Sequence, residues 1–128
     1  MIKGIGVDII ELDRIQHALR KSDKLSKRIL TKEEQRAYSL LEKEYRQVEY
    51  IAGRFAAKEA FAKAAGTGIG RLSFKDIEIS RKRSGQPTLR ARGYEEERIF
   101  LSISHSQAYA VAQVIIEESG ESSKRLKS

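Results

Sequence analysis

Apolar and polar positions alternate at the start of the chain. Between residues 2 and 9, isoleucine and valine alternate with glycine and Asp8, which is the period-two pattern of a strand. Asp8 is expected at the end of this strand, on the face opposite its apolar neighbours; its ordinary alternatives are a helix N-cap or a solvated acid. Leu12, Ile15 and Leu19 then recur at helical spacing, which predicts a helix from residue 11 to about residue 20.

A helical pattern continues through the middle of the chain. Residues 31–34 predict a capping box, in which Thr31 and Glu34 each satisfy a backbone N–H at the start of a helix. A further helix begins near Tyr45 and runs through an alanine-rich stretch, residues 53–65. Alanine favours helix, and Gly66 is expected to end it because glycine readily takes the left-handed conformation found at helix ends.

The alanine-rich helix carries charges on faces that can pack closely. Phe55, Glu59 and Lys63 are successive i,i+4 neighbours, whereas Arg54 and Lys58 lie on another flank. Charges on packed faces need partners, because desolvation of an unpaired charge is costly. Three basic groups and one acid suggest a site for phosphate and a divalent metal ion. The ordinary alternative is a partly solvated amphipathic helix with a Glu–Lys pair.

The second half of the chain changes to a period of two. Strands are predicted at residues 74–80, 87–91, 99–105 and 109–116. A turn is expected at residues 84–85 and a short helical turn at residues 93–98. The glycine-rich loop at residues 66–70 follows a helix and does not open one, so it is not a dinucleotide-binding fingerprint.

The order of these elements predicts the fold class. Helices come mostly first and strands mostly later, which is typical of an α+β fold with an antiparallel sheet packed with helices. We expect a single domain over residues 1–117. Residues 118–128 are polar and lack apolar anchors, so they are expected to form a flexible C-terminal tail.

Composition narrows the class of partner. The 128 residues carry a formal net charge of +7, which predicts an anionic partner: nucleic acid, a phosphorylated cofactor or an acidic protein. The chain has no cysteine, which excludes disulfides and thiolate sites and fits a cytoplasmic protein. We expect no signal peptide and no membrane segment, because no apolar run approaches the roughly 18 residues that a spanning helix needs.

Two carboxylates and one histidine are candidates for chemistry. Asp8 and Glu59 supply oxygen ligands of the kind that Mg²⁺ prefers, although they are far apart in the sequence. His105 closes a predicted strand between two serines, and its ordinary alternative is a satisfied polar residue. A Ser–His hydrolase is not expected, because no nucleophile elbow surrounds Ser104. His17 is expected at the surface.

Two segments together resemble the signature of the phosphopantetheinyl transferases. They are residues 4–8 and residues 54–60; the chain length, the glycine loop and residues 102–106 resemble the small trimeric bacterial type. The resemblance covers residues 1–117. It implies that coenzyme A donates its phosphopantetheine to a serine of apo-acyl carrier protein in fatty acid biosynthesis, releasing adenosine 3′,5′-bisphosphate.

The resemblance also implies roles for individual residues. Asp8 and Glu59 are expected to hold Mg²⁺ and, with Lys63, to form the catalytic set. Coenzyme A is expected to contact a mostly basic group: Arg46, Arg54, Lys58, Lys63, Gly66, Pro87, His105 and Ser106. A structural ion pair is the alternative for Lys58. The serine proton goes either to Glu59 or to a metal-bound water, and both routes stay open.

The basic first helix fits an acidic carrier protein. The residues expected to dock it are Arg14, Lys21, Lys24 and Arg28. The ordinary alternative is a solvated charged face. Where relatives tend to place arginines and an apolar anchor, this chain has Ala18, Lys21 and Lys24, and lysine lacks the bidentate geometry of arginine.

A homotrimer with sites between subunits is also expected. The second-half strands carry more apolar surface than short helices can cover. Arg46, Arg54 and the turn at residues 86–87 are then expected to serve a site whose Asp8 and Glu59 belong to the neighbouring chain.

Two other functional classes compete with the transferase. The first is a small basic nucleic-acid-binding protein, but the basic residues are scattered and no recognised nucleic-acid motif is present. The second is a non-catalytic chaperone of the carrier protein. It would keep the basic helix and would not need Asp8 or Glu59.

Overall fold

The computed structural model describes residues 1–66 and 72–119. Its helices are α1 Leu12–Lys21, α2 Lys24–Ile29, α3 Lys32–Ser39, α4 Glu44–Ala65 and the short 3₁₀ helix η1 Phe74–Asp76. Its strands are β1 Ile2–Glu11, β2 Ile77–Arg81, β3 Pro87–Ala91, β4 Arg98–His105 and β5 Tyr109–Glu117. Among the described residues, no helix is long and apolar enough to cross a membrane.

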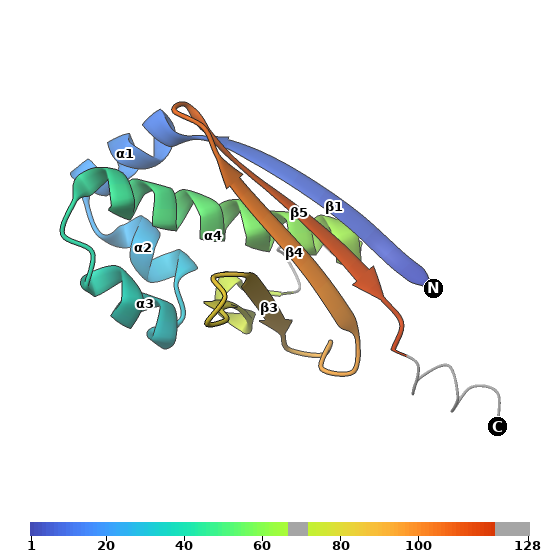
Figure 1. The fold of residues 1–128 in the computed structure, drawn as a ribbon. Helices are drawn as coiled ribbons and strands as arrows, with labels where there is room; N and C mark the ends of the chain where they lie inside the picture. Colours follow the sequence, from blue (N-terminus) through green and yellow to red (C-terminus); the bar gives the residue numbers. More distant parts are fainter. Residues whose placement is uncertain (67–71, 120–128) are drawn as a thin grey trace, which may run out of the picture.

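The strands form antiparallel sheets on which the long helix lies. Within the described residues, one sheet has the order β1-β5-β4, and β2 pairs with β3 in a separate hairpin. Helix α4 runs along one face of the three-stranded sheet, while α1, α2 and α3 gather around one end of it (Figure 1). The predicted α+β fold with an antiparallel sheet is confirmed.

Two glycines bring β1 against α4. A Cβ atom at Gly4 would lie 1.9 Å from the carbonyl oxygen of Ala64, and one at Gly6 would lie 1.9 Å from that of Ala60. Any side chain there would force the strand away from the helix. The glycine face of β1 therefore packs on α4, and Asp8, two residues further along, is on the same face as the glycines.

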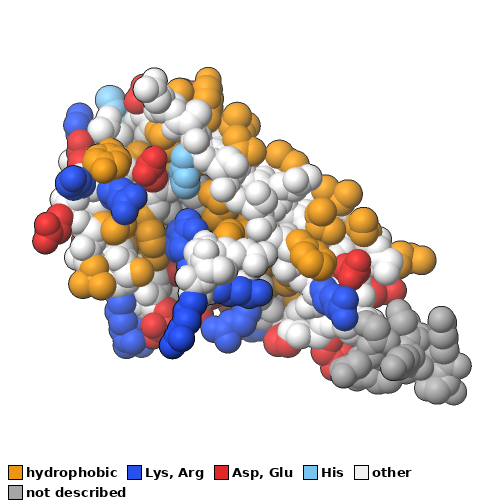
Figure 2. All heavy atoms as spheres, viewed as in Figure 1, with side chains coloured by type: hydrophobic (Ala, Val, Ile, Leu, Met, Phe, Trp, Pro, Cys, Tyr) orange, Lys and Arg blue, Asp and Glu red, His pale blue; other side chains and the backbone are white. Residues whose placement is uncertain are grey.

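The apolar face of β1 points away from the core. Ile5, Val7 and Ile9 are 56%, 49% and 59% exposed. Ile5 and Phe100 flank Ile115 in the register of the sheet, and Phe100 is 51% exposed. Figure 2 shows hydrophobic side chains running along the strands of the sheet. We call the surface formed by Ile5, Val7, Ile9, Phe100, Val111 and Ile115 the outer sheet face.

The core fills the space between α4, the opposite sheet face and the hairpin. Ala56, Ala57 and Ala60 are fully buried and let the helix approach the sheet closely. A second cluster joins the N-terminal half of α4 to α1 and α2, through Ile15, Ile29 and other apolar residues.

Most local predictions are confirmed, and three segments differ. Thr31 and Glu34 form the capping box of α3, and Gly66 ends α4 with φ 76°. The strand expected from residue 74 begins at Ile77, because a capping box between Ser73 and Asp76 winds η1 first. Residues 93–97 form turns rather than a helical turn, and α2 was not predicted. Residues 67–70 of the glycine loop and residues 120–128 of the tail lie outside the described part of the chain.

Candidate active site

Asp8 and Lys63 meet where β1 crosses α4. The Lys63 Nζ donates hydrogen bonds to Asp8 Oδ1 at 3.0 Å and to the Val7 carbonyl oxygen at 3.1 Å. The Asp8 side chain is 16% exposed and the Lys63 side chain is 55% exposed, so the pair is at the surface end of a packed interface. The close glycine contact of β1 with α4 sets this meeting point.

Glu59 lies one helical turn before Lys63 and beside Asp8. Burial raises the pKa of Glu59, and the negative charge of Asp8 raises it further, while Lys63 and Arg28 lower it. Lys63 forms its ion pair with Asp8, although the helical spacing of Glu59 and Lys63 would also allow a pair between those two residues. The structure brings Asp8, Glu59 and Lys63 together, as the family resemblance implied.

This carboxylate pair suits a hard cation. Mg²⁺ typically binds one or two protein carboxylates and completes its octahedron with waters and substrate phosphates. Among the described residues, there is no group of three or more acidic, histidine or cysteine side chains able to hold a metal ion. Burial and, after it, the negative charge of Asp8 disfavour the ionised form of Glu59, and a divalent cation between the two carboxylates would relieve both effects.

A second set of predicted residues lines a cavity of about 360 Å³. Its walls are Leu41, Arg46, Glu49, Tyr50, Arg54, Arg81 and His105, and we call it the basic cavity. Lys and Arg side chains gather around the β2–β3 hairpin beside it (Figure 2). The sequence predicted Arg46, Arg54 and His105 together, and it missed Arg81. The basic run 81–83 was visible, but only the packing of the hairpin places Arg81 here.

His105 is held against α4. Its Nε2–H donates a hydrogen bond to the Glu49 carbonyl oxygen at 3.1 Å. A Cβ atom at Gly53 would lie 3.3 Å from this nitrogen, so the glycine leaves room for the imidazole. His105 also lines the basic cavity.

The basic cavity and the carboxylate pair are on different sides of α4. Arg54 and Glu59 are five residues apart, which in a regular helix means about 7.5 Å along the axis and about 140° around it. Asp8, Glu59 and Lys63 do not line the basic cavity. The carboxylate pair and the basic cavity therefore face different directions.

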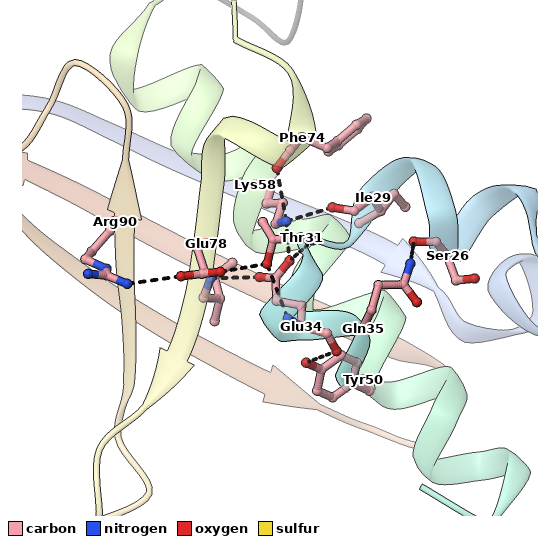
Figure 3. A network of polar contacts seen from close by, with 11 residues as sticks. Ser26, Ile29, Thr31, Glu34, Gln35, Tyr50, Lys58, Phe74, Glu78 and Arg90 are labelled. Carbon is pink, nitrogen blue, oxygen red and sulfur yellow. Dashed lines mark hydrogen bonds and ion pairs between the residues drawn. The ribbon is translucent and has the colours of Figure 1, made fainter. Parts of the chain in front are cut away.

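Lys58 is in the core, and it belongs neither to the carboxylate pair nor to the lining of the basic cavity. Its side chain is 0% exposed, and Nζ donates to Glu34 Oε1 at 2.6 Å, to the Ile29 oxygen at 2.7 Å and to the Phe74 oxygen at 3.0 Å (Figure 3). All three donors of the ammonium group are used. This placement does not support a contact between Lys58 and coenzyme A, and it favours the alternative of a structural ion pair.

Three other predicted residues lie outside the basic cavity. Pro87 begins β3 opposite Arg81, and Gly66 ends α4. Ser106 Oγ accepts a hydrogen bond from the Tyr109 N–H at 3.0 Å in the β4–β5 turn, and Ser106 lines a separate cavity of about 280 Å³ beside α1. Pro87 is linked to the cavity only through its pairing with Arg81.

The predicted docking residues form a basic surface along α1 and α2. Arg14 and Lys21 line one hollow of about 410 Å³, and Lys21, Lys24 and Arg28 line another of about 310 Å³. The Arg28 guanidinium lies 5.6 Å from the centre of the Phe74 ring, and its charge reaches Glu59. This surface therefore leads to the carboxylate pair.

The antiparallel α+β fold and its paired motifs define a class of group-transfer enzyme. The chain belongs to the 4′-phosphopantetheinyl transferase superfamily, whose family model matches residues 4–114. Among curated proteins it is similar to a holo-[acyl-carrier-protein] synthase of Oceanobacillus iheyensis. The two are 56% identical over 117 residues, covering 91% of this chain and 98% of the relative.

Solved structures of the same kind share the fold. A holo-(acyl-carrier-protein) synthase from Bacillus anthracis, solved in complex with CoA (3′,5′-ADP), is 50% identical, with a TM-score of 0.84 over 93% of this chain and 99% of that one. A Helicobacter pylori holo-[acyl-carrier-protein] synthase, solved in complex with coenzyme A, is 33% identical. Its TM-score is 0.76, over 88% of this chain and 99% of that one.

Proposed function

We propose that this protein transfers 4′-phosphopantetheine from coenzyme A to a serine of apo-acyl carrier protein. The products are holo-acyl carrier protein and adenosine 3′,5′-bisphosphate. The meeting of Asp8 and Glu59 beside Lys63, in a member of this superfamily, is the observation that carries the proposal. The nucleic-acid-binding alternative finds no support among the relatives.

Asp8 and Glu59 would hold Mg²⁺, which supplies positive charge against the pyrophosphate of coenzyme A when bound. Lys63 fixes the orientation of Asp8 and presents an exposed ammonium group to the same region. The serine proton passes to Glu59 or to a water held by the two carboxylates. Both routes need Glu59 in its ionised form.

Arg46, Arg54 and His105 are proposed to bind the outer phosphates of the nucleotide. Guanidinium groups match phosphate oxygens through paired hydrogen bonds, and the basic cavity concentrates three of them with an imidazole. Arg81 joins this set. The carrier protein is proposed to dock on the basic surface of α1 and α2.

The working unit is proposed to be a homotrimer with sites between subunits. The outer sheet face exposes a continuous apolar surface, and closed cyclic symmetry is the usual way to bury one. The carboxylate pair and the basic cavity, which we propose are two half-sites, face different directions on one chain, so a complete site needs a neighbour. Light scattering should then give about three times the chain mass. A cytoplasmic location stays a prediction.

The decisive experiment is mass spectrometry of an apo-carrier protein incubated with this chain, coenzyme A and magnesium. We expect a mass gain of one phosphopantetheine, and no gain when the chain or coenzyme A is left out. Binding of the carrier protein without any gain would favour the chaperone alternative. Retention on heparin but not on immobilised coenzyme A would favour the nucleic-acid alternative.

A mixing experiment tests the shared site. Glu59→Gln and Arg54→Glu each damage a different half-site, so each protein alone should be inactive. After the two are unfolded and refolded together, some mixed sites carry both intact halves, and part of the activity should return. An active trimer without such rescue would contradict the shared site while leaving the transferase proposal intact.

Charge reversal tests the docking surface. Arg14→Glu combined with Lys21→Glu should weaken carrier-protein binding and flatten its salt dependence, because exposed charges act mainly on association. The affinity for coenzyme A should barely change. Equal losses for both substrates would show that these residues do not act in docking.

A further inference from the structure

Arg54 is a buried cation whose main neighbour is an aromatic ring. It is 6% exposed, and its guanidinium carbon lies 3.7 Å from the centre of the Tyr50 ring. Its Nε has no hydrogen-bond partner among the described residues. Burial lowers the pKa of Arg54, whereas Tyr50 and the negative charge of Glu34 raise it in part, so Tyr50 favours the charged form that burial disfavours.

The basic cavity adds repulsion to this cost. Arg46, Arg54, Arg81 and His105 converge on one space, and the charge of Arg81 contributes to the lowered pKa of Arg54. Without a bound anion, the guanidinium groups of Arg46, Arg54 and Arg81 favour side-chain positions that separate them, and the Glu49 carboxylate in the same lining offsets part of this repulsion. A ring placed under the guanidinium opposes that separation, because its face attracts a cation most strongly where water is excluded.

A hydrogen bond to α3 fixes the position of Tyr50. Its hydroxyl donates a hydrogen bond to the Glu34 carbonyl oxygen at 3.0 Å (Figure 3). The carboxylate of Glu34 accepts hydrogen bonds from Lys58 Nζ at 2.6 Å and from the Ile79 N–H at 2.7 Å. The ring is thereby tied to α3, α4 and β2 at once.

We propose that Tyr50 is a positioning residue of the coenzyme site, whose ring holds the Arg54 guanidinium in the wall of the basic cavity. The ring covers one face of the guanidinium and leaves its edge, where the N–H donors lie, available to a phosphate oxygen. The buried Glu34–Lys58 pair serves the site indirectly, by fixing Tyr50. This inference rests on the proposed function, because it names what prepares Arg54 for the nucleotide phosphates.

The test compares the ring with the hydroxyl. Tyr50→Leu removes the ring and should raise the KM for coenzyme A about tenfold with kcat little changed, the size of a desolvated cation–π contact. Tyr50→Phe keeps the ring and loses the hydrogen bond that fixes it to Glu34, so it should raise the KM by about threefold or less, clearly below the effect of Tyr50→Leu. Tyr50→Met, which fills space without a ring, should behave as Tyr50→Leu does and covers a failure of the leucine variant to fold.

A double-mutant cycle separates positioning from general damage. Arg54→Gln alone should raise the KM, and adding Tyr50→Leu to it should change the KM by less than about twofold, because the ring then has no guanidinium to hold. Additive effects would overturn the proposal and place Tyr50 in independent contact with the nucleotide. Melting temperatures of all variants record any loss of folding.

Other outcomes have distinct meanings. A Tyr50→Phe variant as impaired as Tyr50→Leu would overturn the role of the ring. An unchanged KM in Tyr50→Leu, with Arg54→Gln impaired, would overturn positioning while leaving Arg54 as a phosphate ligand. A complete absence of transfer by the unaltered protein would overturn the proposed function itself.

Discussion

At the scale of single residues, Asp8 and Glu59 show a conflict between stability and function. Two carboxylates held side by side repel each other, and burial disfavours the charge on Glu59 further. The same arrangement favours binding of a divalent cation, because the positive charge would relieve the repulsion between the two carboxylates. Functional sites commonly retain such locally unfavourable groups, since the rest of the fold compensates for them.

We predict that Asp8→Asn and Glu59→Gln each lower turnover by about a hundredfold or more, because each deletes a charge that faces the metal site. Circular dichroism should be unchanged. In metal-free buffer near neutral pH, Glu59→Gln should also raise the melting temperature. If a variant kept near-normal turnover at low magnesium, the assignment of that residue to the proposed metal site would be wrong.

The direction in which the pKa of Glu59 is shifted determines how stability and activity should depend on pH. Its pKa is raised above the ordinary 4.5, so the folded state binds this proton more tightly than the unfolded chain does. Protonation of Glu59 therefore stabilises the folded state at pH values below the ordinary pKa, and this contribution to the free energy of unfolding is lost as the pH rises through the raised pKa. Activity has the opposite trend, because it needs the ionised form.

We therefore predict that at limiting magnesium the acidic limb of the activity profile lies above the pH at which an ordinary glutamate titrates, and that it moves to lower pH as the magnesium concentration rises. The pKa of Glu59, followed by carboxyl carbon NMR in metal-free protein, should match this shift in direction, and magnesium should lower it. A Glu59 pKa at or below 4.5 in the metal-free protein would contradict the prediction.

At the scale of elements, the contact between β1 and α4 sets the geometry of the carboxylate pair. Gly6→Ala would place a methyl group within 1.9 Å of the Ala60 carbonyl oxygen, and this backbone atom cannot move without shifting the helix. We predict that the free energy of unfolding falls by about 1–3 kcal/mol. Turnover should also fall, because the shift of the strand displaces Asp8 from Glu59. Denaturant titration and steady-state kinetics check both.

The matched control for Gly6→Ala is Lys3→Ala in the same strand. Lys3 is exposed and pairs with Glu97 at the surface, so its removal should change stability and turnover little. If Gly6→Ala were as well tolerated as Lys3→Ala, the close approach of strand and helix would not be what places Asp8.

The Lys58–Glu34 pair joins α4 to α3 at the core. We predict that Lys58→Met lowers the free energy of unfolding by about 3–5 kcal/mol, because it leaves the Glu34 carboxylate buried without its cation. The control, Arg36→Met, breaks an exposed pair with Glu33 and should have little measurable effect. A coenzyme KM that rises sharply while stability is unchanged would instead restore Lys58 to the site.

At the scale of the whole molecule, the outer sheet face tests the assembly. We predict that Ile5→Glu prevents trimer formation, because it places a charge in the middle of a surface that oligomerisation would bury. Size-exclusion chromatography with light scattering should then report a single chain mass, and turnover should fall with the loss of shared sites. A fully active monomer at assay concentration would contradict both the trimer and the shared site.

Local patterns in the sequence determined most of the helices and strands. The capping box at Thr31 and Glu34, the C-terminal Gly66 and the alternation through β1 depend on backbone within a few residues, so a single segment carries the information. The paired motifs around Asp8 and Glu59 indicated the family and the two carboxylates that we propose bind a metal ion. Their proximity required packing, and it was predicted only through resemblance.

The tertiary structure decided which charges serve the site and which serve the fold. Lys58 and Lys63 are five residues apart on one helix, yet one is buried against Glu34 and the other lies beside Asp8. Their environments come from elements distant in the sequence, so no local pattern could separate them. Packing between distant elements also decides which face of β1 is exposed. The alternation in the sequence predicts that the strand has two different faces. Only the fit of its glycines against α4 determines that the glycine face is buried and the apolar face is exposed.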